Sequence, residues 1–476
     1  MLTVNLSRVT VFARILQLVA LSFFSFNCFA KDNFIIDQQE AFVLHNVNLV
    51  DGTGSEVQKN KAIFVKSGKI VAIENASEEV SADYVVHDFS GYTLTPGFVM
   101  MHEHMFYPTG KANYTEMVYS FPKLYLAGGA TTIRTAGTTE PYADLNLNQA
   151  IQAGKTIGPD IDVTAPYLNG PGLPIKKIKA LENADDAERM VNYWSAEGAS
   201  SYKVYMHIRK SELSRVNKLA HQNNQKVTGH ICSITFEEAA DLGIDNIEHG
   251  FVEASDFVFN KKENECPSGK LQTESILALD NDDEKIKKLI KHLVKNNVAI
   301  TSTLTVFETF AKSRPIAPKQ ALDVLTTDIK HEYLGHWSRI QESDSDVWLK
   351  LLKKEMAWEK LFVEMGGHLM VGTDPTGYGG VIAGFSNIRA IQLLTEAGFT
   401  FEQAIKIATT NGAEYLGKAD TIGSIAVGKR ADFVLVNGLP HINVADLNKI
   451  ERVYKAGIGY DSQTIFNAMK NTVGLH

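Results

Sequence analysis

Histidine, lysine and aspartate occur at the ends of several strand-like segments of this sequence. Residues 96–108, PGFVMMHEHMFYP, place His102 and His104 on either side of a glutamate, directly after an apolar run. Residues two apart on a strand point to the same face, so both imidazoles can reach one metal ion. Glu103 points the other way and is not expected to be a ligand. Further candidates are Lys203 in SYKVYM, His230 in KVTGHI, His249 in NIEHGF and Asp374 in HLMVGTDP.

Each of these residues alone has a simpler explanation. A single strand histidine is more often a hydrogen-bonded core residue, and a buried lysine usually pairs with a carboxylate. Asp374 precedes a proline and could simply open a turn. Their joint occurrence favours another interpretation, because five separate strand ends present metal-compatible groups. Imidazole nitrogen and carboxylate oxygen bind zinc and similar divalent ions, so the sequence predicts a metal centre.

The elements around these residues indicate how they are brought together. After Pro96, strand-like runs alternate with amphipathic segments such as 211–224 and 347–365. The runs that follow the opening stretch are 129–136, 160–168, 201–206, 226–231, 246–251, 299–306 and 368–375. Eight strands alternating with helices predict an α/β fold, a (β/α)8 TIM barrel. The carboxyl ends of its strands form one mouth, where the candidate ligands would converge.

The two ends of the chain have a different sequence pattern. Residues 31–95 and 418–476 contain short β-like runs broken by turn residues, such as AIFVKSGKIVAI and GSIAVGKRADFVLVNG. We predict one small β-sandwich domain formed by both chain ends. The barrel, residues 96–417, would be inserted between its two parts.

Residues 1–30 have the order of a secretory signal peptide. Arg8 and Arg14 precede the apolar run 15–26, and Cys28 and Ala30 occupy the −3 and −1 positions of a cleavage site. The run is shorter than the ~20 apolar residues that a spanning helix needs. We therefore expect cleavage, a periplasmic or secreted protein, and no stable membrane insertion afterwards. A retained anchor and lipidation of Cys28 are the alternatives.

Charge and cysteine content narrow the range of partners. The chain has 47 Lys and Arg against 55 Asp and Glu, a formal net charge of −8, and it shows no basic block. Nucleic acid is therefore not expected as a partner. Cys232 and Cys266 are the cysteines that remain after cleavage. They could pair in an exported protein, but a chain of this size does not need a disulfide to fold, so we expect two free thiols.

These motifs together resemble the amidohydrolase superfamily. The resemblance covers nearly the whole mature chain and rests on LVDGTG, SGKIVAI, TPGFVMMHEH, Lys203, TGHI, IEHG, GTDP, ATTNGAEYLG and GSIAVGKRADFVLVNG. It is strongest to the imidazolonepropionase-related and prolidase-like members. The family often has an aspartate just before the first histidine, where this chain has Met101. That position is not a ligand, so the departure concerns supporting contacts.

The resemblance implies a centre of two divalent ions. Zinc is the metal expected, because it binds imidazole nitrogen and carboxylate oxygen. The ligands implied are His102, His104 and Asp374 for one ion, His230 and His249 for the other, and a carboxylated Lys203 that bridges both. Carboxylation is needed because an ammonium group has no lone pair. Mononuclear members lack this lysine, so its presence favours two ions. Asp374 would take the proton of the attacking water and pass it to the leaving amine.

The function implied is that of an exported metal-dependent amidohydrolase. Its substrate would be a small-molecule amide, such as a dipeptide or an N-acyl amino acid. An esterase, lactonase or cyclic amidase with the same site is the alternative, and a non-catalytic periplasmic binding protein is a third hypothesis. The sequence leaves a homo-oligomer open.

Contacts to the substrate are predicted near the ends of the strands. Tyr107, Tyr205 and His207 could bind a substrate carboxylate or a developing oxyanion, and packing or support of the ligands is an equal alternative. The loops 169–174 and 376–384 follow strand ends and could border the pocket.

Overall fold

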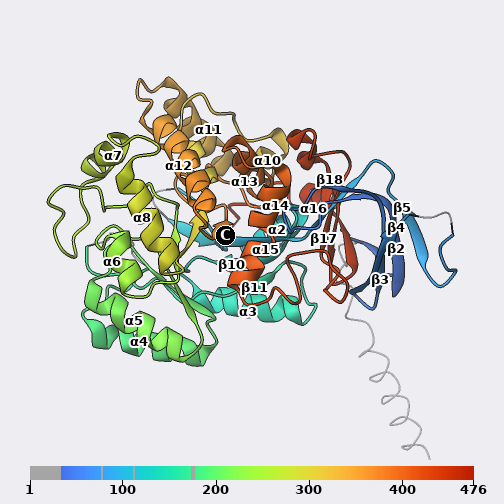
Figure 1. Cartoon of the computed structure of the whole chain (residues 1–476), viewed down its shortest axis with the longest axis horizontal. Helices are drawn as coiled ribbons and strands as arrows, with labels where there is room; N and C mark the ends of the chain where they lie inside the picture. The colour runs from blue at the N-terminus through green and yellow to red at the C-terminus, as the bar shows by residue number, and fades with distance from the viewer. Residues whose placement is uncertain (1–33, 77–78, 111–112, 173–176, 476) are drawn as a thin grey trace, which may run out of the picture.

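The computed structural model describes residues 34–76, 79–110, 113–172 and 177–475 (Figure 1). The predicted signal peptide, residues 1–30, lies outside the described residues. In the part of the chain that is described, no helix has the length and apolar character needed to cross a membrane.

Both ends of the chain contribute to one nine-stranded sheet, of order β1-β19-β18-β17-β6-β2-β3-β4, with β5 paired to β2. Figure 1 shows the blue strands of the N-terminal part beside the red strands of the C-terminal part at one end of the molecule. Phe42, Ile63, Leu94, Phe433 and Tyr454 belong to the separate apolar core of this sheet. The sandwich form of this unit stays a prediction. The strands are β1 (Ile35–Asp37), β2 (Ala41–Leu49), β3 (Gln58–Lys66), β4 (Lys69–Asn75), β5 (Val85–Asp88), β6 (Thr93–Pro96), β17 (Phe433–Val436), β18 (Ile450–Lys455) and β19 (Ile458–Asp461).

Between the chain ends, eight strands alternate with helices in a mixed α/β arrangement. The strands are β7 (Phe98–Glu103), β10 (Ala130–Thr135), β11 (Asp160–Asp162), β12 (Ser201–Val204), β13 (Lys226–Gly229), β14 (Asn246–Glu248), β15 (Ala299–Ser302) and β16 (Leu369–Val371). They form two sheets, of order β11-β10-β7 and β12-β13-β14-β15-β16, and all pairings within them are parallel. Their carboxyl ends therefore lie at one edge of each sheet.

Main-chain contacts join the two sheets at both sides. Isolated parallel bridges between Thr164 and Ser201 and between Leu168 and Val204 connect the β11 segment to β12. On the other side, the backbone N–H groups that follow β16 donate to the carbonyl oxygen of His102 on β7, at 3.1 and 3.0 Å. The eight strands are thus linked in chain order.

Helices cover the outside of these strands (Figure 1). They are α2 (Phe121–Ala127), α3 (Pro141–Gln152), α4 (Ala184–Glu197), α5 (Lys210–Gln222), α6 (Phe236–Asp241), α7 (Gly269–Leu277), α8 (Glu284–Lys295), α9 (Leu304–Phe310), α10 (Lys319–Val324), α11 (Thr327–Glu342), α12 (Val347–Glu364), α13 (Phe385–Glu396), α14 (Phe401–Ala408), α15 (Thr410–Tyr415), η1 (Val444–Lys449) and α16 (Ser462–Ala468). A hairpin of β8 (Phe106–Pro108) and β9 (Tyr114–Glu116) follows β7.

The helix α8 illustrates how the sequence pattern produces these elements. Its buried residues Ile286, Leu289, Ile290 and Leu293 recur at the spacing of one helical face. The side chain of Asp283 accepts a hydrogen bond from the backbone N–H of residue 285 and so caps the first turn. The amphipathic pattern therefore turns one face of α8 towards the core.

Two expectations from the sequence differ from the structure. The run 299–306 is a strand only to Ser302, after which α9 begins, because a short apolar run does not by itself distinguish strand from helix. The prediction of two free thiols is wrong: Cys232 and Cys266 form a disulfide with Cα atoms 4.9 Å apart. The segment before α7 folds back to the end of β13, and this approach cannot be seen from a separation of 34 residues.

Candidate metal centre

The six residues predicted as metal ligands meet at one cavity at the carboxyl ends of the parallel strands. The cavity has a volume of about 110 Å³. Its lining includes His102 and His104 from the end of β7, Lys203 from β12, His230 after β13, His249 after β14 and Asp374 after β16. Five strand ends thus supply one cluster, although ion binding itself stays a prediction.

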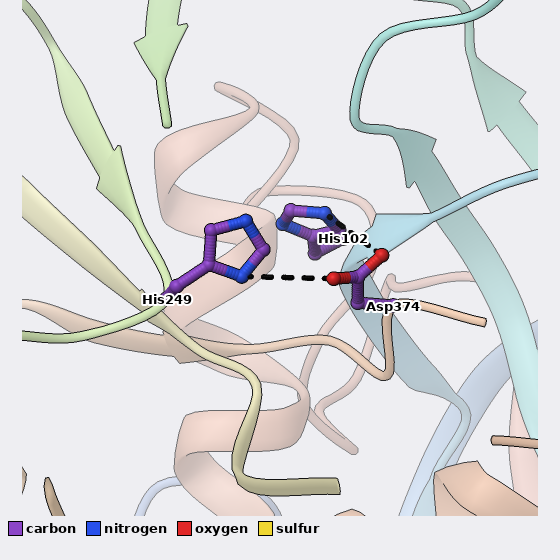
Figure 2. A group of neighbouring side chains, drawn as sticks. All are labelled: His102, His249 and Asp374. Carbon is purple, nitrogen blue, oxygen red and sulfur yellow. Dashed lines mark ion pairs between the residues drawn. The ribbon is translucent and has the colours of Figure 1, made fainter. Parts of the chain in front are cut away.

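His102, His249 and Asp374 form the tightest group, and their potential ligand atoms lie within 4.8 Å of one another. In Figure 2 both rings face the carboxylate: His102 Nε2 lies 3.6 Å from Oδ1 of Asp374, and His249 Nδ1 lies 3.7 Å from its Oδ2. His104 Nε2 is 3.3 Å from Oδ1. Burial alone would raise the pKa of Asp374, but His102 and His104 outweigh it and hold this pKa below its usual value.

Hydrogen bonds on the far side of two rings decide which nitrogen faces the cavity. His104 Nδ1 lies 3.0 Å from the carbonyl oxygen of Gly137. A carbonyl can only accept, so Nδ1 carries the proton and Nε2 keeps its lone pair. His102 Nδ1 lies 2.7 Å from Oε2 of Glu248, and burial lowers the pKa of His102 to about 4. The imidazole of His102 is thus neutral, and the two rings are oriented as metal ligands require.

His249 is held by an unusual turn. It has φ 67° and the following Gly250 has φ 63°, both in the left-handed region. The backbone N–H of Phe251 donates to both carboxyl oxygens of Glu355 on α12, each at 2.9 Å. A Cβ atom on residue 250 would lie 1.6 Å from Oε1 of Glu355, so only glycine fits there. The turn and α12 together direct the imidazole of His249 into the cavity.

Two buried nitrogen atoms at the site lack hydrogen-bond partners in the described part of the chain, although each lies 3.8 Å from a carboxylate, that of Glu248 or that of Glu253. Lys203 Nζ and His230 Nε2 have no hydrogen-bond partner among the described residues. Lys203 Nζ lies 3.8 Å from Glu248 Oε1, too far for a hydrogen bond. Burial lowers the pKa of Lys203 to about 8, so a larger fraction of this amine is neutral at a given pH than for an exposed lysine. Unsatisfied buried groups are costly, so these two atoms fit a site that holds a further group.

A buried polar network lies against the ligands, and sequence reasoning missed it. Glu248 accepts hydrogen bonds from Arg134 Nη2 at 2.6 Å and from Thr228 Oγ1, and it also contacts His102 and Lys203. Burial would raise the pKa of Glu248, but the neighbouring positive charges hold it well below its usual value. Charged residues inside the apolar runs GATTIRTA and NIEHGF were the signal that could have revealed this network.

Glu103 lies outside the cavity lining, as strand alternation predicts. Its carboxylate accepts hydrogen bonds from the backbone N–H of Thr373 at 3.0 Å and from the Thr373 hydroxyl. Burial raises the pKa of Glu103 to about 8. The residue therefore ties β7 to the segment after β16, next to Asp374.

The structure separates the three predicted substrate contacts. As far as the chain is described, the cavity lining includes Tyr205 but neither Tyr107 nor His207. The buried Tyr107 donates its hydroxyl to the carbonyl oxygen of Gly379 at 2.5 Å. His207 falls outside because β12 ends at Val204, so strand alternation no longer applies beyond that point.

Aromatic residues from other segments complete the cavity wall. They include Phe106, Tyr114 and Tyr167, which the sequence did not single out. Phe106 stacks on His104 with ring centroids 4.4 Å apart. Of the two loops predicted to border the pocket, 376–384 contributes Thr376, whereas the described residues 169–172 do not line it.

Comparison with known proteins gives a family match and several partial relatives. Residues 93–471 match the Amidohydrolase family. A dihydroorotase of Elusimicrobium minutum (strain Pei191) is 33% identical over 110 residues, which cover 23% of this chain and 24% of the relative. An imidazolonepropionase of Bacteroides fragilis (strain YCH46) is 41% identical over 68 residues, 13% of this chain and 16% of the relative. The chain thus matches about a quarter or less of the length of these curated relatives.

Solved structures resemble the chain over most of its length. A putative prolidase from Bifidobacterium longum aligns with a TM-score of 0.64 and 21% identity, over 90% of this chain and 99% of the prolidase. A Xaa-Pro dipeptidase with bound methionine aligns with a TM-score of 0.65 and 19% identity, over 88% and 100% of the two chains. At this identity the likeness concerns the fold.

Proposed function

The chain belongs to the amidohydrolase family, hydrolases that act on carbon–nitrogen bonds, and we propose that it is an exported member of this family. The proposed enzyme holds two divalent metal ions and cleaves the amide bond of a dipeptide or an N-acyl amino acid. One observation carries the proposal. Six metal-compatible side chains from five strand ends line a single cavity, and two of them have buried nitrogen atoms without hydrogen-bond partners among the described residues.

The proposed scaffold is a closed (β/α)8 barrel. It is supported by the two parallel sheets, which hydrogen bonds and bridges link on both sides. A barrel would hold the ligands on separate rigid strands and therefore at stable separations.

The donor set fits two ions such as zinc. The residues that would hold them are His102, His104 and Asp374 for one ion, His230 and His249 for the other, and Lys203, once carboxylated, between them. When bound, the ions supply Lewis acidity and make water a nucleophile near neutral pH. The lowered pKa values of His102 and Lys203 support this assignment, because both ligation and carboxylation need an unprotonated nitrogen.

The chain's own residues supply the remaining steps. Asp374 keeps its carboxylate ionised, so Oδ1 or Oδ2 can accept a proton and deliver it to the leaving amine. Burial raises the pKa of Tyr205, so its hydroxyl stays protonated and can donate to a substrate carbonyl or carboxylate. Phe106 and Tyr167 line the cavity and help to exclude bulk water from it.

Two features support export and a small substrate. The Cys232–Cys266 disulfide is typical of proteins that fold in an oxidising compartment, and residues 1–30 have the order of a signal peptide. A cavity of about 110 Å³ admits a small molecule. N-terminal sequencing of the mature protein tests export, and an intact Met1 would contradict cleavage.

Metal analysis and a substrate panel on the same preparation test the function. We expect close to two ions per chain and turnover of dipeptides or N-acyl amino acids. Turnover restricted to esters, lactones or cyclic amides would make the proposed bond wrong, and a metal-loaded protein that hydrolyses nothing would be a binding protein. His230→Ala should lose metal and activity, whereas the matched control His207→Ala, outside the cavity lining, should retain both.

A further inference from the structure

The structure contains a second cavity, larger than the one at the candidate metal centre. Its volume is about 220 Å³, against about 110 Å³ for the first. Segments that line it are α9, residues 311–318, α11, the loop after β16 and α13. Among the described residues, none lines both cavities. The second cavity is therefore a separate space.

Most of the wall of the second cavity is apolar. Tyr333, Trp337, Tyr378 and Phe385 present aromatic rings, and Ile316 lies at the rim, where 38% of its surface is exposed. Aromatic side chains offer large, flat contact areas with little conformational freedom to lose. This lining favours a mainly apolar ligand with a planar part.

The charged residues of the wall, Arg314, Arg389 and Glu308, form ion pairs with one another and with Glu396, which lies outside the lining. Arg314 and Arg389 both pair with Glu308, at 2.6 and 2.7 Å, and Arg314 also pairs with Glu396 at 2.6 Å. Two cations therefore face two anions at hydrogen-bonding distance. A charged ligand would have to compete with these pairs, so the wall favours an uncharged molecule.

Two polar groups in the wall are left without partners. Trp337 Nε1 and Ser386 Oγ are buried and have no hydrogen-bond partner within the described part of the chain. Only 6% of the surface of Ser386 is exposed. The indole nitrogen can only donate, and the serine hydroxyl can donate as well, so each would be satisfied by an acceptor such as a carbonyl oxygen.

We propose that the second cavity is a binding site for a small, uncharged, mainly apolar molecule that accepts hydrogen bonds from Trp337 and Ser386. The chemical class is that of aromatic or branched ketones and amides. This inference concerns binding and does not depend on the proposed hydrolytic activity.

The loop after β16 connects the second cavity to the candidate metal centre. Thr376 lines the first cavity and donates its hydroxyl to Asp374 Oδ1 at 2.9 Å. Tyr378, two residues on, lines the second cavity and donates to the carbonyl oxygen of Thr309 at 3.0 Å. A ligand against Tyr378 would therefore contact the same loop that reaches the candidate metal centre through Thr376.

Calorimetric titration with acetophenone tests the binding site, because this probe combines one aromatic ring with one carbonyl and carries no charge. Saturable binding of one molecule per chain is expected for the full chain. Trp337→Phe keeps the ring but removes the donor, so it should weaken binding roughly 3- to 10-fold. Ile316→Trp should fill the cavity from its exposed rim and abolish binding.

Matched variants separate the second cavity from other sites. Trp348→Phe is the control for Trp337→Phe, because Trp348 packs on Phe307 and Phe310 outside the described linings of both cavities. Tyr205→Phe alters the first cavity, and both controls should bind acetophenone as the wild type does. Absence of saturable binding would overturn the proposal, and so would binding that Tyr205→Phe weakens while Ile316→Trp leaves it unchanged. Circular dichroism shows that each variant is folded.

Discussion

Replacement of Glu355 by alanine is expected to disturb the turn that directs His249 into the cavity. His249 and Gly250 both have positive φ, and such conformations cost about 1–3 kcal/mol each for residues other than glycine. They persist only where neighbouring contacts hold them. Glu355 supplies such a contact, since both of its carboxyl oxygens lie 2.9 Å from the backbone nitrogen of Phe251.

The size of the effect follows from these contacts. Without Glu355, the buried N–H of Phe251 loses its acceptor, which costs ~1–3 kcal/mol of folding free energy. Loss of a group that orients a metal ligand typically weakens metal binding by about 10- to 100-fold. Because each tenfold change corresponds to about 1.4 kcal/mol, the loss in binding free energy is about 1.4–2.8 kcal/mol.

The assay measures zinc affinity by competition with a chelator, together with thermal unfolding, for the wild type and three variants. Glu355→Ala should show both losses. Glu355→Gln keeps a carbonyl acceptor for Phe251 and should retain most of the affinity. Glu359 lies one helical turn further along α12, and its buried carboxyl interacts with Glu355, whereas the acceptor of the Phe251 N–H is Glu355. Glu359→Gln therefore serves as the control that changes this carboxyl pair and keeps the hydrogen bond to the turn.

The reasoning would be refuted by a Glu355→Ala protein that binds zinc as tightly as the wild type. If that protein also unfolds at a lower temperature, Glu355 stabilises the fold without orienting His249. If Glu359→Gln loses as much zinc affinity and thermal stability as Glu355→Ala, the interaction between Glu355 and Glu359 matters and not the hydrogen bond to the turn.

Three further predictions concern other parts of the molecule. Lys203→Ala should lose at least one of two ions in elemental analysis, and retention of both would contradict the bridging role. Gly250→Ala should lower the urea midpoint, because its Cβ would lie 1.6 Å from Glu355 Oε1; an unchanged midpoint would show that the turn can shift. Burial, and then the charge of Asp144, raises the pKa of Glu116 from 4.5 to about 8, so the folded chain retains a proton that the unfolded chain releases. This contribution to stability is complete below pH 4.5 and is lost as the pH rises through about 8. Glu116→Gln should therefore reduce the fall in melting temperature between about pH 5 and about pH 8, and an unaltered profile would contradict the assignment.

The functional residues at the strand ends were predictable because residue type and strand alternation are local properties of the sequence. Alternation along β7 places His102 and His104 on one face, and the strand-like runs SYKVYM and HLMVGTDP contain Lys203 and Asp374. Parallel strands bring their carboxyl ends to the same edge, so residues far apart in the chain can be expected at one mouth. This argument works only up to the last residue of a strand, so it does not apply to His207, which lies beyond Val204 and outside the cavity lining.

Contacts between distant segments were not predictable in the same way. The Cys232–Cys266 bond depends on a loop that folds back, and the pairing of Arg134 with Glu248 depends on side chains that meet between strands. Tyr107 follows a strand end, yet its hydroxyl reaches a loop that is 272 residues away in the chain. Neither hydrophobic period nor residue type contains this information.

The sequence by itself determined which residue types stand at the strand ends and, through strand alternation, that His102 and His104 share a face while Glu103 does not. The tertiary structure alone decided which nitrogen of each ring faces the cavity, because the deciding acceptors come from distant segments, Glu248 from β14 and Gly137 from the loop after β10. It also decided that Lys203 is buried without a hydrogen-bond partner among the described residues, since only packing removes a lysine from water.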